Sequence, residues 1–147
     1  MSSQITIQSH KGEYSVSFVR GGIDLLNSNP IEDAVYIIDQ NIAQLYRERL
    51  KNILNSRVLI IEANEENKSL SHFPDYIKAL VKLNIRREQT LVAIGGGIIQ
   101  DITCFLATTL MRGLPWVFYP TTLLAQSDSC IGSKSSINSG DVKNILG

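Results

Sequence analysis

Three consecutive glycines, Gly95 to Gly97, follow an apolar run and open a segment with helical spacing. Because glycine lacks a Cβ atom, backbone N–H groups here can approach a phosphate closely, and a helix N-terminus adds partial positive charge. The spacing is not that of a Gly-x-Gly-x-x-Gly fingerprint, which disfavours an ordinary Rossmann dehydrogenase. The glycines therefore indicate a pyrophosphate site, and a tight strand-to-helix turn without any ligand explains them equally well.

Four charged residues could bind the rest of a dinucleotide. Asp39 closes an apolar run, where an acid commonly binds ribose hydroxyls, although the same carboxylate could instead cap the following helix. Glu65 and Lys68 lie three positions apart and either hold a ribose or form a solvated charge pair. Asp101 lies one helical turn after the glycines, which predicts a ligand contact or a surface acid stabilised by the helix dipole.

A second group of charges follows the glycines. Arg112, Asp128, Lys134 and Lys143 all stand among small or apolar residues. Burying such charges unpaired is costly, so we expect them to contact each other or an anionic ligand. Three cations suit a phosphate or a carboxylate.

Composition excludes several other functions. The 147 residues have zero net charge and 44% hydrophobic content, which is typical of one globular domain and unlike a binder of nucleic acid. The sequence has no run long enough to span a membrane and no signal peptide, so we expect a cytoplasmic protein.

The scarce histidines and cysteines predict no metal site in this chain. His10 and His72 have no second histidine at ligand spacing, and we expect them on the surface or in loops. Cys104 and Cys130 are far apart, so we interpret both as buried thiols.

The elements that position these residues alternate along the chain. Residues 5–9 and 14–19 predict an antiparallel hairpin at an edge, and residues 23–26 a helical turn or loop. Residues 34–39, 57–62, 90–94 and 116–119 predict strands of a parallel sheet, the first two buried on both faces. Residues 41–50, 69–83 and 97–110 predict the intervening helices.

This alternation predicts a doubly wound, Rossmann-like α/β fold with right-handed crossovers. In the first helix the apolar spacing involves Ile42, Leu45, Tyr46 and Leu50. In the second the apolar stripe is formed by Phe73, Ile77, Leu80 and Val81. Ligands of such sheets bind beyond the carboxyl ends of the strands, where the predicted site residues would gather.

Several of these motifs together resemble the 3-dehydroquinate synthase family and its wider sugar phosphate cyclase group. The motifs are Gly95-Gly-Gly-Ile-Ile-Gln-Asp101, Arg112-Gly113, Pro120-Thr-Thr-Leu-Leu-Ala125, Asp128-Ser-Cys-Ile-Gly-Ser-Lys134 and Lys143-Asn144. The resemblance is specific over residues 91–147 and looser over 34–68. It implies an amino-terminal NAD-binding domain without the metal-binding carboxyl-terminal domain, and the abrupt end at Gly147 suggests a fragment.

The resemblance also implies roles for individual residues. NAD would be contacted by Asp39, Asn41, Glu65, Lys68, Gly96, Gly97, Ile98, Asp101, Thr121, Thr122 and Lys143. The substrate would be contacted by Arg112, Asp128, Lys134 and Asn144. A divalent metal, zinc or cobalt, would be held by a glutamate and two histidines of the carboxyl-terminal domain, and a homodimer is expected.

The implied reaction cyclises a sugar phosphate. It combines transient oxidation of a secondary alcohol by NAD, elimination of phosphate, reduction of the ketone and an intramolecular aldol reaction. In 3-dehydroquinate synthases the substrate is 3-deoxy-D-arabino-heptulosonate 7-phosphate, in the shikimate pathway of aromatic amino acid biosynthesis. We expect the isolated chain to be inactive.

Alternatives remain open at this stage. Gln100 replaces a small residue of the family pattern, Ser133 a glycine, and residues 139–142 the usual Pro-Leu-Gly approach to Lys143-Asn144. Related cyclases act on sedoheptulose 7-phosphate or glucose 6-phosphate. A metal-dependent alcohol or polyol dehydrogenase domain is a second reading, although Arg112-Gly113 and residues 128–134 favour the cyclase. A third is a nucleotide-binding or dimerising domain without catalysis.

Overall fold

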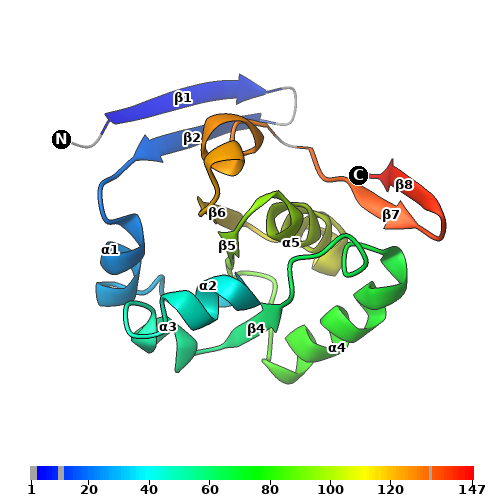
Figure 1. Ribbon diagram of the computed structural model, residues 1–147, viewed down its shortest axis with the longest axis horizontal. Coiled ribbons are helices and arrows are strands. Elements are labelled where there is room, and N and C mark those ends of the chain that lie inside the picture. The colour runs from blue at the N-terminus through cyan, green and yellow to red at the C-terminus, as the bar shows by residue number, and fades with distance from the viewer. Residues whose placement is uncertain (1–2, 10–11, 133) are drawn as a thin grey trace.

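The computed structural model describes residues 3–9, 12–132 and 134–147, and a four-stranded parallel sheet forms its centre (Figure 1). The strands are β3 (Val35–Asp39), β4 (Val58–Ile61), β5 (Leu91–Gly95) and β6 (Trp116–Pro120). They are arranged in the order β4-β3-β5-β6, and every neighbouring pair is parallel. The predicted Rossmann-like parallel sheet is confirmed.

The two central strands contain the most apolar part of the sequence. Every residue of β3 and β5 is buried, as expected for strands covered on both faces. The prediction that residues 57–62 form an equally buried strand is wrong, because β4 pairs only with β3 and Ile60 is 47% exposed. The outer strand β6 likewise exposes Val117.

Helices cover both faces of this sheet, and the alternation of side chains decides which helix packs on which face. The helices on one face are α1 (Gly22–Ser28), α2 (Gln40–Leu45) and α3 (Lys51–Leu54). Those on the other are α4 (Phe73–Lys82) and α5 (Gly97–Thr109). Tyr36 and Ile38 pack toward α2 and α3, whereas Val35 and Ile37 pack toward α4 and α5.

Two predicted helices differ from the structure. The helix expected over residues 41–50 ends early, because α2 stops at Leu45, which is 77% exposed. Residues 46–50 form a turn, and α3 begins only at Lys51. In α4, Phe73 and Leu80 are buried as predicted, but Ile77 and Val81 are exposed. Tyr76 packs against the core instead, so the buried stripe is narrower than the sequence indicates.

Two hairpins lie outside the central sheet. The predicted amino-terminal hairpin is confirmed as β1 (Ser3–Ser9) and β2 (Gly12–Phe18), a separate two-stranded sheet. His10, which was expected on the surface or in a loop, lies outside the described residues. A second hairpin is formed by β7 (Ile137–Ser139) and β8 (Val142–Leu146).

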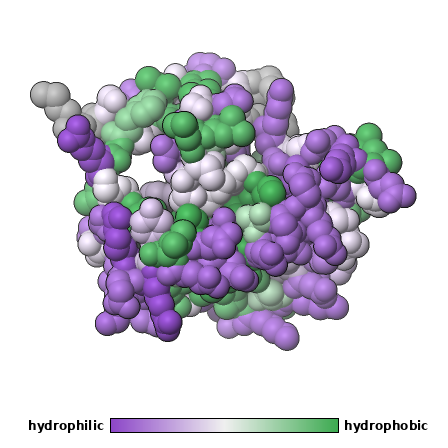
Figure 2. All heavy atoms as spheres, in the orientation of Figure 1, coloured by the Kyte–Doolittle hydropathy of each residue, from purple (hydrophilic) through white to green (hydrophobic). Residues whose placement is uncertain are grey.

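Three short irregular helices connect these elements. They are η1 (Leu70–His72), η2 (Leu110–Arg112) and η3 (Ala125–Ser129), the last with π-helical hydrogen bonding. Figure 2 shows apolar side chains over the top of the molecule, where the β1-β2 hairpin and η3 lie. The exposed apolar residues of this region include Phe18, Leu123 and Leu124. Among the described residues, the helices are too short or too polar to cross a membrane.

Candidate cofactor site

The order of the strands places a topological switch point between β3 and β5, where a ligand-binding crevice is expected. From β3 the chain continues to β4 on one side, and then crosses to β5 on the other side of β3. The connections that follow β3 and β5 therefore run in opposite directions. Open parallel sheets bind ligands at the place where two neighbouring strands have this arrangement. Ile38 pairs with Ile94, so Asp39 and Gly95 are the next residues along, at the carboxyl ends of the two strands.

The glycines allow the backbone to pack tightly at this crevice. A Cβ atom added at Gly95 would lie 2.7 Å from Ile99 Cγ1 and 3.3 Å from Asp39 Cβ. One added at Gly96 would lie 3.0 Å from Thr122 Cγ2. Helix α5 then begins at Gly97, and no described side chain caps its first N–H groups. Such uncapped N–H groups at the start of a long helix fit a pyrophosphate.

Two threonines after β6 complete this turn. The Thr121 amide donates a hydrogen bond to the Gly95 carbonyl at 2.9 Å, and Thr122 Oγ1 accepts one from the Ala125 amide at 3.2 Å. The buried hydroxyls of Thr121 and Ser129 have no hydrogen-bond partner among the described residues. Since buried polar groups are usually paired, these two hydroxyls fit a site that a polar ligand completes.

Asp39 has one role that the structure confirms. It is the N-cap of α2, and its Oδ1 accepts a hydrogen bond from the Asn41 amide at 2.9 Å. The side chain also lies beside Gly95, next to the glycines of the proposed pyrophosphate site. The cap and the ribose contact are compatible, and the second stays a prediction.

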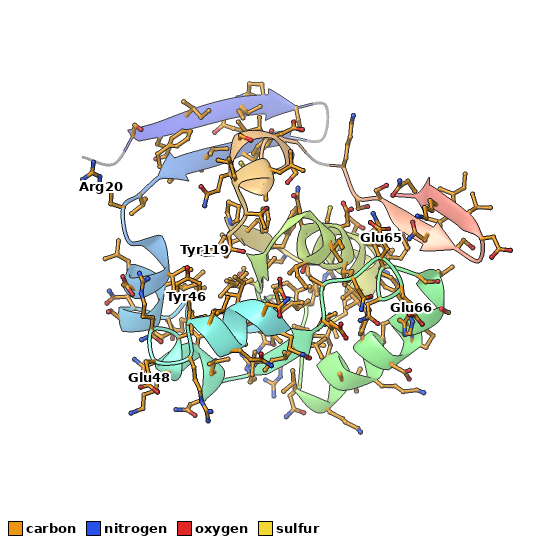
Figure 3. The ribbon with its side chains drawn as sticks, viewed as in Figure 1. Arg20, Tyr46, Glu48, Glu65, Glu66 and Tyr119 are labelled. Atoms are coloured by element: carbon orange, nitrogen blue, oxygen red, sulfur yellow. The ribbon has the colours of Figure 1, made fainter. Side chains whose placement is uncertain are left out.

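A buried lysine contacts three other predicted site residues, which lie on three segments of the chain. Lys68 is only 5% exposed, and its Nζ lies 3.3 Å from Asp101 Oδ2, 3.8 Å from Glu65 Oε1 and 2.9 Å from Asn144 Oδ1. Figure 3 labels Glu65 on the loop after β4, and its carboxylate accepts a hydrogen bond from Asn138 of β7. The interpretation of Glu65 and Lys68 as a merely solvated pair is wrong, because Lys68 is enclosed.

Asp101 is electrostatically coupled to this lysine. Partial burial raises the pKa of its carboxyl above the ordinary value, and the nearby Lys68 ammonium opposes that rise. The desolvation of the carboxylate therefore outweighs its attraction to the lysine. Asp101 is neither a freely solvated surface acid nor a strongly stabilised anion.

The four residues Arg112, Asp128, Lys134 and Lys143 do not form the enclosed cluster expected from sequence. All four are exposed, and the ion pairs of the described residues include none of them. The expectation that they contact each other is wrong, because they lie on irregular segments and on the β7-β8 hairpin at the surface. Their contact with an anionic ligand stays a prediction, and Ser133 lies outside the described residues.

The remaining predicted residues make few contacts of their own. Asn41 is exposed at the start of α2, and its backbone amide donates a hydrogen bond to Asp39. Ile98 packs partly against the core, and His72 is partly buried in η1. Cys104 is buried as predicted, whereas the expected burial of Cys130 is wrong, since it is partly exposed in the turn after η3.

Sequence reasoning missed two buried amides near the site. Asn138 is 6% exposed and bonds both Glu65 and Asn144. Gln100 is also buried, and its Nε2 donates to the Ser129 carbonyl while its Oε1 has no partner among the described residues. For Gln100 the only signal in the sequence is a polar residue inside a largely apolar stretch, whereas Asn138 stands among serines and has no such signal. Within the described ranges, no group of three or more His, Cys, Asp or Glu side chains could hold a metal ion.

Comparison with known proteins assigns the family. The family model for the amino-terminal part of 3-dehydroquinate synthase matches residues 58–147, more than half of the sequence. The chain belongs to the 3-dehydroquinate synthase family. The 3-dehydroquinate synthase of Clostridium tetani is 38% identical over 114 residues, which cover 76% of this chain and 31% of the relative.

Another relative matches a larger part of this chain. The 3-dehydroquinate synthase of Shewanella denitrificans is 38% identical over 136 residues, covering 86% of this chain and 38% of the relative. The chain thus spans about a third of the length of these curated members of the family.

Solved structures of sugar phosphate cyclases share the fold. A 2-deoxy-scyllo-inosose synthase complexed with carbaglucose-6-phosphate, NAD+ and Co2+ matches with a TM-score of 0.80 and 25% identity, covering 99% of this chain and 42% of that chain. The 2-epi-5-epi-valiolone synthase of Streptomyces hygroscopicus subsp. jinggangensis 5008, with NAD+ and Zn2+ bound, matches with a TM-score of 0.71 and 30% identity. That match covers 83% of this chain and 37% of the synthase.

Proposed function

We propose that this chain binds NAD at the crevice between β3 and β5, as the cofactor-binding part of a sugar phosphate cyclase. The observation that carries the proposal is the uncapped start of α5, which lies between Asp39 and Thr122. The glycines allow this close approach, because a Cβ atom at Gly95 or Gly96 would collide with neighbouring side chains. This geometry suits a pyrophosphate. The solved cyclases with NAD+ bound support the choice of cofactor.

The places of the residues support the roles that we propose for them. The amides of Gly96 and Gly97 would bind the pyrophosphate, and Asp39 would accept hydrogen bonds from ribose hydroxyls. Glu65 and Lys68 would hold the second ribose beyond the start of α5. NAD supplies an acceptor for the hydride of an alcohol and later returns that hydride.

On the substrate side, the exposed cations have a different role. Arg112 and Lys134 would bind the phosphate and carboxylate of the substrate, because exposed cations with no ion pair in the described protein remain available to an anion. Asp128 and Asn144 would orient its hydroxyls. The proposed reaction is that of 3-dehydroquinate synthase, the name shared by the curated relatives.

A different substrate within the same cyclase group is the second candidate. Gln100 binds the carbonyl of Ser129, directly after Asp128, so a departure from the family pattern lies beside a proposed substrate residue. The cyclase solved with carbaglucose-6-phosphate supports a sugar phosphate of this class. The family match favours either cyclase over a polyol dehydrogenase.

The complete activity requires more than these residues. We propose that the metal-binding part of the enzyme lies in a carboxyl-terminal domain, as the divalent metals of the solved cyclases suggest. We expect this chain alone to bind NAD and to show no turnover. A homodimer and a cytoplasmic location stay predictions.

Titration of the 147-residue chain with NAD tests the proposal. With uniform 15N labelling, the amide signals of Gly96 and Gly97 should shift as NAD is added, with a dissociation constant below the millimolar range. A folded chain whose glycine amides do not respond to millimolar NAD would refute cofactor binding here. Release of phosphate from a sugar phosphate by this chain alone would refute the proposal that the activity needs a further domain.

A further inference from the structure

The side chains of Glu65, Lys68, Asn138 and Asn144 form a closed ring of polar contacts. Lys68 Nζ lies 3.8 Å from Glu65 Oε1 and donates to Asn144 Oδ1 at 2.9 Å. The Asn144 backbone amide donates to Asn138 Oδ1 at 2.9 Å, and Asn138 Nδ2 donates to Glu65 Oε2 at 3.1 Å. We call these four residues the Asn138 ring.

The side-chain amide of Asn138 contacts Glu65 through its nitrogen and Asn144 through its oxygen. Its nitrogen also donates to the Glu65 backbone carbonyl at 3.2 Å, and its own backbone amide donates to the Lys68 carbonyl at 3.1 Å. Asn138 itself is buried, whereas Glu65 and Asn144 are exposed, so these bonds are partly shielded from water. Asn138 therefore fixes the loop of Glu65 and Lys68 with its nitrogen and Asn144 with its oxygen.

The local backbone explains why Asn144 needs this support. Ile137 pairs with Leu146 and Ser139 with Val142, so residues 143–145 lie opposite Asn138 alone, in an irregular part of the β7-β8 ladder. Asn144 has a left-handed conformation with φ of 55°, which asparagine adopts more easily than most residues. The side-chain oxygen of Asn138 accepts the amide that the regular ladder would otherwise pair.

The ring is open to a ligand on one side. An open pocket of about 430 Å³ is lined by residues of the two segments that the ring joins, among them Glu65, Asn138 and Lys143. A ligand that binds Glu65 therefore meets a carboxylate already oriented by Asn138. The orientation of Asn144 depends on the same amide group.

We infer that Asn138 is a positioning residue that orients Glu65 for the cofactor and Asn144 for the substrate. The inference rests on the proposed function for the roles of Glu65 and Asn144. Asn138 itself needs no contact with either ligand. The positions of the cofactor-binding Glu65 and of the substrate-binding Asn144 then both depend on the Asn138 side chain.

Two substitutions separate the two ends of the amide. Asn138→Asp keeps an oxygen that can accept the Asn144 amide, but it loses the donor to Glu65 and places a like charge beside it. We expect NAD affinity to fall about tenfold while hydrogen exchange of the Asn144 amide stays slow. Asn138→Ala should lower NAD affinity similarly and accelerate exchange of the Asn144 amide about tenfold or more.

Asn52→Ala is the matched control, because Asn52 also donates from its side chain to a backbone carbonyl, that of Asn27, far along the chain from the ring. It should change neither NAD affinity nor Asn144 exchange. All variants are compared by circular dichroism and at a temperature where each is folded. Parallel changes of both readouts in Asn138→Asp and Asn138→Ala would overturn the inference and indicate a purely structural role.

Failure of the proposed function gives a different result. If the wild-type glycine amides do not respond to NAD, cofactor binding is refuted, and the part of the inference that concerns Glu65 is refuted with it. The exchange rate of the Asn144 amide still decides the other part, because that measurement needs no ligand. Slow Asn144 exchange in Asn138→Ala would overturn this part.

Discussion

The ammonium group of Lys68 lies 3.3 Å from the carboxylate of Asp101, although the two residues are 33 positions apart in the sequence. This ion pair connects the loop after β4 to the first turns of α5. It is largely enclosed, unlike the pair of similar length between Lys78 and Asp75 on the surface of α4. The two pairs make a matched comparison.

Replacing Lys68 with Met should destabilise the fold and weaken NAD binding. The substitution leaves the Asp101 carboxylate half-buried without its cation and removes a donor from Asn144. We expect a loss of about 2–4 kcal/mol in the free energy of unfolding, measured with urea. Lys78→Met should change it by less than about 0.5 kcal/mol, since an exposed ion pair contributes little. Equal effects of the two substitutions would contradict the proposed burial effect.

The raised pKa of Asp101 predicts a dependence of stability on pH. Because the folded protein binds this proton more tightly than the unfolded chain, ionisation of Asp101 costs stability above its unfolded value of 3.8. Lowering the pH toward 3.8 relieves that cost in the wild type, whereas Asp101→Asn has no such proton to bind. As the pH falls, the wild type should therefore gain stability relative to Asp101→Asn. Urea unfolding of both proteins between pH 7 and 4 measures this difference. A difference independent of pH would contradict the raised pKa.

Replacing Gly96 with Ala should obstruct the crevice. The new Cβ atom would lie 3.0 Å from Thr122 Cγ2 and beside the amides proposed to bind the pyrophosphate. We expect about tenfold weaker NAD binding and a loss of about 1 kcal/mol in stability, by calorimetric titration and urea unfolding. Adding Thr122→Ser removes the obstructing methyl group and should recover the stability. The control Gly22→Ala, whose Cβ would have no atom within 4 Å, should leave NAD affinity unchanged.

Asp39→Asn separates the two roles of this residue. Asparagine is an equally good N-cap, so the stability should stay within about 0.5 kcal/mol of the wild type. The loss of the carboxylate should weaken binding of NAD about tenfold and improve binding of NADP, whose additional phosphate the acid repels. Titrations with both nucleotides measure the ratio. An unchanged ratio would mean that Asp39 is only a helix cap.

The amino-acid pattern was sufficient for the parallel sheet and for the place of the glycines. In β3 and β5 both faces are buried, so their sequences do not show the alternation of apolar and polar residues that marks a half-exposed strand. The length and the apolar character of the two runs still identify them as strands. The identity of the outer strands was not predictable in the same way. Ile60 is as apolar as Ile38, and only the strand order leaves it exposed.

The candidate site was predictable in type more than in geometry. Asp39 and the glycines follow strands, so their convergence follows from topology. The enclosure of Lys68 does not, because it depends on the irregular β7-β8 hairpin, where Asn144 turns back toward the lysine. Asn138 has no distinguishing sequence signal, since its importance comes from partners 73 positions earlier and six positions later.

The completely buried strands β3 and β5 have a consequence for motion. Asp39 and Gly95 can separate only if the most protected part of the sheet opens, which costs nearly the whole free energy of unfolding. Strand β8 is exposed over residues 142–145 and lies outside that sheet, so it can fray while Ile137 and Asn138 of β7 stay buried. We therefore expect a bound dinucleotide to leave by transient fraying near Lys143, while the pyrophosphate end of the crevice remains rigid.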